Sequence, residues 1–217
     1  MTGVIRKATL LVALGLVAAS AAMAGIPNAA NCTVPTFIKV VGANGSVADS
    51  RGTFSITVRD IGNVVVPNSV VTLNFTSCTD MRLCSGGVGV TCTPAQVTGT
   101  TNVSGVVSFT VVGGGLHTGG IVTGPGAGCI TIRADGYVIG TATAVVFDLN
   151  GAVVGTGKNG VSIGDLGPFL ADMGGGVYRG RSDFNQSGTL SIADLSPWLQ
   201  CNGAGTSSSG CTTTYCP

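Results

Sequence analysis

Short apolar runs rich in Val, Ile, Thr and Phe recur through the first two thirds of the chain, with Gly, Asn and Pro between them. In the run 53–59, Phe54, Ile56 and Val58 alternate with polar residues, which predicts a strand with one buried face. Many short strands with turns between them are typical of an antiparallel β-sandwich. The predicted strands are 37–41, 53–59, 69–75, 106–112, 129–133 and 141–147.

Motifs rich in glycine give the predicted turns between these strands. The signals are Asn44-Gly45, Gly62-Asn63 and the three glycines at 113–115, because these residue types tolerate the backbone angles of tight turns. The segment 78–92 carries three cysteines and several glycines. It is therefore predicted to be an inserted loop closed by a disulfide.

The order of motifs in this region resembles the bacterial Ig-like domains of invasin and intimin, known as the Big-1 type. The resemblance rests on Ile-Thr-Val-Arg-Asp-Ile-Gly-Asn at 56–63, Val-Pro-Asn-Ser-Val-Val-Thr-Leu at 66–73 and Thr-Thr-Asn-Val-Ser-Gly-Val-Val-Ser-Phe at 100–109. It implies an Ig-like sandwich at 25–147. Such a domain usually acts as a spacer or an adhesive stalk, although a fold alone does not fix a function.

After residue 148 the strand pattern gives way to a duplicated motif. Val-Ser-Ile-Gly-Asp-Leu-Gly-Pro-Phe-Leu at 161–170 aligns with Leu-Ser-Ile-Ala-Asp-Leu-Ser-Pro-Trp-Leu at 190–199, and six of the ten positions are identical. A repeat of this kind indicates one structural unit used twice. The aligned aromatic residues, Phe169 and Trp198, are predicted to fill a small core rather than to bind sugar.

The second copy of the motif overlaps a loop at 183–194, called the second loop, whose spacing is that of an EF-hand calcium loop. Alternate residues of such a loop point inward, and Gly188 at position 6 lets the chain turn back. Ser191 and Asp194 also form a capping box that starts a helix. The predicted ligands are Asp183, Asn185, Ser187, the carbonyl of Thr189 and Asp194.

The sequence allows two interpretations of the second loop (183–194), a calcium site and a turn without metal. Its two carboxylates predict a calcium affinity that is moderate, roughly micromolar to millimolar. The alternative is an Asx-rich turn that precedes a helix and binds no metal.

A first loop, 148–165, fits the same pattern less well. Asp148, Asn150 and Asp165 are predicted to form a second, weaker calcium site if an insertion at about 152–158 is looped out. Counting back from Asp165 without an insertion places Lys158 at position 5, where its ammonium group would oppose a cation. If no ion binds here, the first loop is a structural mate of the second loop (183–194).

Duplicated loops with Asp at position 12 followed by Leu, each leading into a short helix, resemble the type I dockerin family. The resemblance implies a small α-helical module at 148–203 that folds around Ca²⁺ and docks onto a partner called cohesin. Pro168 and Pro197, three residues past each aspartate, depart from the family pattern. We expect each helix to restart there, with Ser196 as the cap and Pro197 at the first helical position of the second.

The first 24 residues have the organisation of a secretory signal peptide. Arg6 and Lys7 give a charged start, 8–21 is apolar, and Ala-Met-Ala at 22–24 is a cleavage site. A membrane anchor is the alternative, but the apolar run is short and no stop-transfer charges follow it. The predicted mature chain is therefore secreted or displayed at the cell surface, has no membrane span, and ends in a tail rich in Gly, Ser and Thr at 204–217.

All eight cysteines follow the predicted cleavage site, and an even number in a secreted protein predicts disulfides. Zinc is the rival interpretation, but the chain has no Cys-x-x-Cys motif, and its single histidine, His117, is expected in a solvated loop. Odd numbers of cysteines before residue 130 and after residue 200 indicate a bridge between the modules or between molecules. The short spacing of Cys211 and Cys216 predicts a local staple. The disulfide candidates are Cys32, Cys78, Cys84, Cys92, Cys129, Cys201, Cys211 and Cys216.

Charge and motif content bear on the class of function. The chain has ten basic residues, and cleavage of the predicted signal peptide would remove Arg6 and Lys7, which leaves eight basic against nine acidic residues. This near-neutral charge argues against a nucleic-acid partner. No catalytic constellation is visible, so an enzyme is not predicted. We expect a non-catalytic calcium-binding protein whose Ig-like domain is attached to a protein partner, either cohesin-like or a second copy. The alternative is a structural or adhesive subunit of an extracellular fibre or surface layer, in which calcium only stabilises the fold.

Overall fold

The computed structural model describes residues 25–44, 47–116, 128–153, 160–202, 211 and 213–217. The predicted signal peptide at 1–24, His117 and Lys158 lie outside the described residues. Within the described ranges, no helix is both long enough and apolar enough to cross a membrane.

The chain is mainly β, and each strand predicted from the sequence is present. The strands are β1 (Phe37–Val41), β2 (Ala43–Asn44), β3 (Val47–Ala48), β4 (Thr53–Thr57), β5 (Val70–Asn74), β6 (Met81–Leu83), β7 (Val90–Cys92), β8 (Ala95–Thr100), β9 (Val106–Gly115), β10 (Ile130–Ala134) and β11 (Tyr137–Val146). The helices are α1 (Leu166–Gly174) and α2 (Leu195–Cys201), and the 3-10 turns are η1 (Ser50–Gly52), η2 (Ile163–Asp165), η3 (Gly180–Ser182) and η4 (Ile192–Asp194).

The strands form a mixed sheet in the order β4-β9-β1-β11-β10-β5-β8-β7, with β6 paired to β9. The prediction of a purely antiparallel arrangement is wrong at β1, which runs parallel to its neighbours β11 and β9. Most of the β domain lies between β1 and β11 in the sequence, so no hairpin turn constrains their relative direction. The register pairs Phe37 with Thr143 and Val40 with Val146.

The sheet folds over, so that strands far apart in its order face each other. The first part of β11 pairs with β10 and its second part pairs with β1, so this long strand belongs to both halves. Strands β8 and β9 are not paired, yet Gly99 of β8 lies against the side chains of Val107 and Phe109 of β9. The core between the two halves includes the fully buried Ile38, Ile56, Leu73 and Ile132.

The three glycines at 113–115, predicted to form a turn, instead lie buried within β9. Gly113 faces the Arg82 carbonyl of β6, and Gly115 faces the Leu149 carbonyl. A side chain would not fit at either contact, because the neighbouring backbone approaches too closely. This glycine run therefore marks close backbone packing rather than a change of chain direction.

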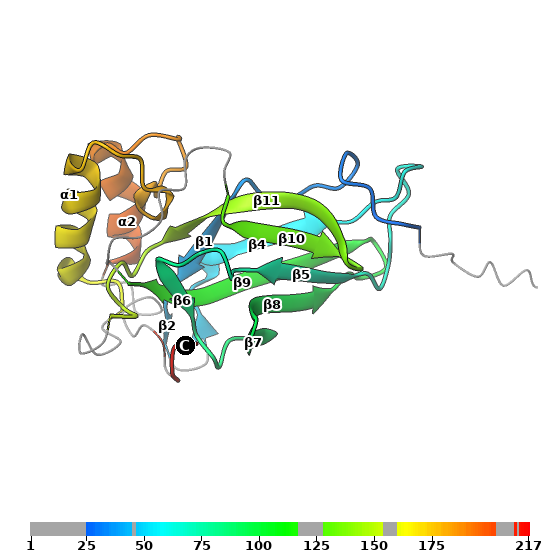
Figure 1. Cartoon of the computed structure of the whole chain (residues 1–217), viewed down its shortest axis with the longest axis horizontal. Helices are drawn as coiled ribbons and strands as arrows, with labels where there is room; N and C mark the ends of the chain where they lie inside the picture. Colours follow the sequence, from blue (N-terminus) through cyan, green and yellow to red (C-terminus); the bar gives the residue numbers. More distant parts are fainter. Residues whose placement is uncertain (1–24, 45–46, 117–127, 154–159, 203–210, 212) are drawn as a thin grey trace, which may run out of the picture.

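Figure 1 shows α1 and α2 at the same end of the strands. Each follows a 3-10 turn directly, and the helices begin at Leu166 and Leu195. Pro168 and Pro197 are therefore third residues of their helices, where a backbone N–H has no intrahelical acceptor. The prediction that Ser196 caps a restarted helix is wrong, because η4 already runs into α2 at Leu195.

An aromatic cluster joins the helical segment to the strands. The rings of Phe147 and Phe184 lie 5.0 Å apart, and those of Phe184 and Phe169 lie 5.6 Å apart. Phe169 and Trp198 are buried in the same cluster as the strand residues, so the prediction that they fill a core is confirmed. The helical segment thus extends the core of the β domain.

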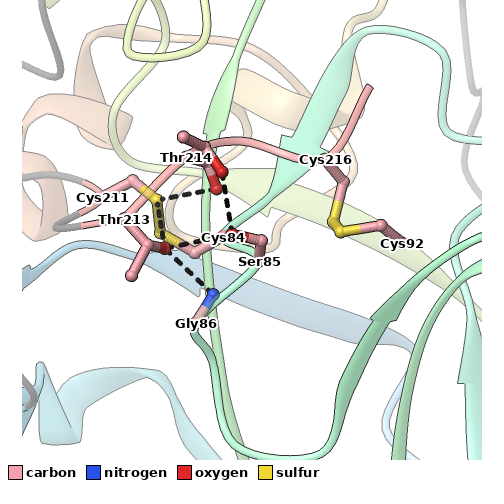
Figure 2. Close-up of a disulfide and its surroundings, with 8 residues drawn as sticks. All are labelled: Cys84, Ser85, Gly86, Cys92, Cys211, Thr213, Thr214 and Cys216. Carbon is pink, nitrogen blue, oxygen red and sulfur yellow. Dashed lines mark hydrogen bonds between the residues drawn. A yellow bond between two sulfur atoms is a disulfide. The ribbon is translucent and has the colours of Figure 1, made fainter.

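Disulfides tie the C-terminal tail to the β domain (Figure 2). Among the described residues the pairs are Cys78–Cys129, Cys84–Cys211 and Cys92–Cys216. The predicted closure of a loop within 78–92 and the predicted local staple between Cys211 and Cys216 are both wrong. Cys84 directly follows β6 and Cys92 ends β7, and both meet the returning tail instead of each other.

The two remaining cysteines are Cys32 and Cys201. Cys32 forms no disulfide in the described chain, and its sulfur lies 3.4 Å from the backbone nitrogen and oxygen of Arg59. Cys201 is buried at the end of α2.

Candidate metal-binding loops

The second loop (183–194) is built around a buried carboxylate. Asp183 is fully buried, and its Oδ1 accepts a hydrogen bond from the Ser187 amide at 3.0 Å. Its Oδ2 accepts from the Gly188 amide at 2.8 Å and from the Tyr178 hydroxyl at 2.7 Å. These donors fix the carboxylate that the EF-hand spacing places at position 1.

The neutral oxygen groups of the second loop lie close together. Asn185 Oδ1 accepts a hydrogen bond from the Ser187 amide at 2.9 Å, and the Ser187 hydroxyl donates to the Thr189 carbonyl at 3.1 Å. Gln186 and Gly188 have φ angles of 62° and 82°, and these left-handed conformations turn the chain back. The structure therefore brings together the residues predicted at positions 3, 5 and 7.

Asp194 closes the second loop from η4. Its Oδ1 accepts from the Asn185 amide at 3.1 Å, and its Oδ2 accepts from the Ser191 amide at 2.9 Å. The Ser191 hydroxyl accepts in turn from the Ala193 amide, which completes the capping box. Burial raises the pKa of Asp194, and the charge of the neighbouring Asp183 adds to this effect.

The first loop (148–165) repeats this arrangement. The Asn150 amide donates to Asp165 Oδ1 at 3.1 Å, and the Ser162 amide donates to Asp165 Oδ2 at 2.9 Å. Both distances equal those around the last aspartate of the second loop. Asn150 therefore stands at position 3 and Asp148 at position 1, so the extra residues of this repeat fall between Asn150 and Ser162.

Asp148 is fully buried, and neither of its carboxylate oxygens has a hydrogen-bond partner of good geometry among the described residues. Burial raises the pKa of Asp148 to about 8, and the charge of Asp165 contributes to the rise. Buried carboxylates are costly unless they are hydrogen-bonded, paired or bound to a metal. The first loop therefore contains a buried position that favours a cation.

The donors of both loops fit a hard cation. Asp148 with Asp165, and Asp183 with Asp194, give each loop a pair of carboxylates, and the other predicted groups are amide, hydroxyl and carbonyl oxygens. Ligand sets made only of oxygen suit Ca²⁺. In the described part of the chain, no three side chains drawn from His, Cys, Asp and Glu converge. A site here therefore depends on the neutral oxygens as well as on the carboxylates.

Sequence reasoning missed the tyrosines beside the two loops. Tyr178 donates to Asp183, and burial together with this hydrogen bond raises the pKa of Tyr178. The Tyr215 hydroxyl is buried near the first loop, where burial and the charge of Asp148 raise its pKa. Tyr178 lies ahead of the EF-hand spacing, and Tyr215 reaches its loop only through the tertiary fold, so no local pattern signals either residue.

A buried ion pair anchors the segment between the loops. Arg181 donates through Nε and Nη2 to the two carboxylate oxygens of Asp172, at 2.8 and 2.7 Å. The Ser182 hydroxyl donates to the same carboxylate at 2.6 Å. Arg181 Nη1 also lies 3.8 Å from Asp80, just ahead of β6. These contacts join the helical segment to the β domain.

Comparison with known proteins returns no relative. No protein-family model, no curated protein and no solved structure matches this chain. The geometry of the loops and the residues that form them are therefore what indicate a function for this chain.

Proposed function

We propose that this is a secreted, non-catalytic calcium-binding protein, in which a dockerin-like helical module (148–203) attaches an Ig-like β domain to a protein partner. The observation that carries the proposal is the repeated carboxylate geometry. Asp165 and Asp194 each accept the same pair of backbone hydrogen bonds at the same distances. A duplicated ion-binding loop accounts for this equality, and the resemblance to dockerins suggests the attachment role.

The chain offers each ion a defined set of ligands. In the second loop they are Asp183, Asn185, Ser187, the Thr189 carbonyl and Asp194. In the first loop they include Asp148, Asn150 and Asp165. Bound Ca²⁺ supplies the positive charge that offsets repulsion within each carboxylate pair. Asp148 gains most, because it is fully buried and its oxygens form no hydrogen bond of good geometry among the described residues.

Equivalent residues of the two repeats expose apolar side chains. Ile163 and Ile192 are 71 % and 67 % exposed, and Leu170 and Leu199 are 45 % and 58 % exposed. Each pair occupies one position of the aligned repeats, so the two repeats expose equivalent apolar side chains. Exposed large apolar side chains are candidates for contact with another protein. This pattern supports attachment to a partner.

The alternative role, a subunit of an extracellular fibre or surface layer, draws part of its support from disulfides between molecules. The three disulfides among the described residues all lie within one chain. The six cysteines that form them are therefore already paired within the chain.

Calorimetric titration of the chelator-treated protein with calcium tests the metal assignment. We expect two binding events, of which Asp183→Asn removes one and Asp148→Asn removes the other, because each substitution takes away a position-1 carboxylate. The exposed Asp135, in the turn between β10 and β11, provides the control, since Asp135→Asn leaves both events in place. Absence of any binding by the unmodified protein would contradict the proposal.

Calcium-dependent capture tests the attachment role. Immobilised protein is mixed with a cohesin domain, or with a second, labelled copy of the chain, in calcium or in chelator. We expect binding only in calcium, and at least a tenfold loss when Asp replaces Ile192 and Leu199 together, because these are the exposed apolar residues of one repeat. Failure to bind either partner in both conditions counts against this role, and assembly into fibres favours the alternative.

A further inference from the structure

A tyrosine from outside the EF-hand spacing reaches the second loop (183–194). Tyr178 precedes position 1 of this loop by five residues, and the turn η3 (Gly180–Ser182) lies between them. The Gly180 carbonyl accepts a hydrogen bond from the Asp183 amide at 3.2 Å. The turn brings the half-buried Tyr178 back onto Asp183, and its hydroxyl donates to Asp183 Oδ2 at 2.7 Å.

The turn η3 is itself anchored to helix α1. Arg181 donates to both carboxylate oxygens of Asp172, at 2.8 and 2.7 Å, and the Ser182 hydroxyl donates to the same carboxylate at 2.6 Å. All three residues are buried. Buried hydrogen bonds to a charged group are among the strong ones in proteins. The position of Tyr178 is therefore set by contacts that lie ahead of the loop in the sequence.

The Tyr178 hydroxyl limits how the fully buried Asp183 can bind a cation. Each oxygen of an ionised carboxylate offers about two lone pairs. Oδ2 of Asp183 uses both, because it accepts from the Gly188 amide at 2.8 Å as well as from Tyr178. Oδ1 accepts from the Ser187 amide at 3.0 Å, which leaves one of its lone pairs for a cation.

The three donors to Asp183 have different origins. Two are backbone amides of the loop itself, Ser187 and Gly188, and they follow from the loop conformation. The third, the Tyr178 hydroxyl, is a side chain supplied by a separate segment. Groups that hydrogen-bond to a metal ligand orient it, and their loss typically weakens metal binding tenfold or more. The hydroxyl is also the donor that a substitution can remove without changing any residue of the loop.

We propose that Tyr178 is a positioning residue of the second calcium loop: its hydroxyl holds the Asp183 carboxylate so that Oδ1 stays available to the ion. The inference rests on the calcium-binding function proposed above, and it adds a determinant of affinity that lies outside the loop. An intact EF-hand spacing is then not sufficient for full affinity, because the anchored turn must also present the hydroxyl.

Calorimetric titration of the full chain with calcium tests this role. The Asp148→Asn background isolates the second loop. We expect Tyr178→Phe to raise the Kd for calcium about tenfold, because the ring is kept and only the orienting hydroxyl is lost. Tyr137→Phe is the matched control, since Tyr137 is 51 % exposed at the start of β11, and its Kd should not change. An unchanged Kd in Tyr178→Phe, or an equal loss in Tyr137→Phe, overturns the inference.

Urea unfolding with and without calcium separates positioning from packing. A hydroxyl that only packs would lower the midpoint equally in calcium and in chelator, because the affinity of the folded protein would be unaltered. We expect calcium to raise the midpoint of Tyr178→Phe by less than it raises that of the unmodified protein. Equal increases in the two proteins would contradict the positioning role.

The same titrations distinguish failure of the inference from failure of the proposed function. If the unmodified protein binds no calcium, the proposed function fails and the inference fails with it. If calcium binds and Asp183→Asn abolishes one event, but Tyr178→Phe has no effect, only the role of Tyr178 is wrong.

Discussion

Arg181 is 4 % exposed, and its charge is met by Asp172 within hydrogen-bond distance and by Asp80 at longer range. Buried ion pairs add little net stability over apolar residues of the same size, but losing one partner leaves an uncompensated charge in the interior. Each residue of the pair is therefore needed only as long as the other is present, because its loss would leave the partner's charge buried and unpaired.

Asp172→Asn should lower the free energy of unfolding by about 3 kcal/mol, because Arg181 would keep its charge without its bidentate acceptor. Urea denaturation of the calcium-free protein measures the change. The double variant with Asp172→Leu and Arg181→Met removes both charges and should recover most of the loss. A loss below about 1 kcal/mol for Asp172→Asn alone would show that the pair is exposed to water in solution.

The raised pKa of Asp148 should make the stability of the calcium-free protein depend on pH. Its pKa is about 8 in the fold, because of burial and the charge of Asp165, against an ordinary value near 4 in the unfolded chain. The folded state therefore binds the proton more tightly, and the stability from this group is lost as pH rises from about 4 through about 8. Thermal unfolding in chelator should show this loss, and Asp148→Asn should reduce it. A decline of equal size in Asp148→Asn would assign it to other groups.

At the scale of elements, each repeat starts its helix by the same device. Ser162 and Ser191 each accept a hydrogen bond through the hydroxyl from an amide two residues ahead, and the aspartates three residues on accept one from the serine amides. Each aspartate has two roles, because it caps the helix and also closes the loop. These fixed contacts explain why a short helix with proline at its third position begins at a defined residue.

Loss of a capping hydroxyl should destabilise each repeat by a similar amount. Ser191→Ala and Ser162→Ala are each expected to cost about 1 kcal/mol, the usual effect of losing a helix N-cap. Urea denaturation in chelator gives the value without a contribution from bound calcium. Ser191→Thr keeps the hydroxyl and should lie within about 0.5 kcal/mol of the unmodified protein. Unequal costs for the two alanine variants would mean that the repeats are not equivalent.

At the scale of the whole molecule, the helical segment and the β domain share one core. Phe184 bridges Phe147, at the end of β11, and Phe169, in α1. The tail disulfides add covalent links to β6 and β7 from the other side of the helical segment in the sequence. The chain is therefore held as one cooperative body, although the sequence divides it into regions of different pattern.

The whole chain should unfold in one transition. The single Trp198 reports on the helical segment through its fluorescence, and far-ultraviolet circular dichroism reports mainly on the strands. We expect both signals to change at the same urea concentration in the oxidised protein, as two-state unfolding requires. If calcium binds as proposed, it should shift both midpoints upward together, because the residues of each loop come together only in the folded state. Separate midpoints would show that the two regions unfold independently.

Local patterns were enough to predict the strands and the residues of the second loop. Alternation in 53–59 places Ile56 inside, and the spacing from Asp183 to Asp194 brings those carboxylates together. The features that were missed depend on contacts between distant segments. Contacts with distant segments determine four features: the parallel pairing of β1, the burial of the β9 glycines, the partners of the cysteines and the position of Tyr215.

The tail disulfides also impose an order on biosynthesis. Cys84 pairs with a residue 127 positions later, and Cys92 with one 124 positions later, so both thiols must wait while most of the chain is made. Meanwhile the nearest thiols in sequence, including Cys78, emerge first and are the available partners for premature oxidation. Efficient maturation therefore calls for an isomerase that exchanges early pairings, and the yield of correctly bonded protein depends on the cell that makes it as well as on the sequence.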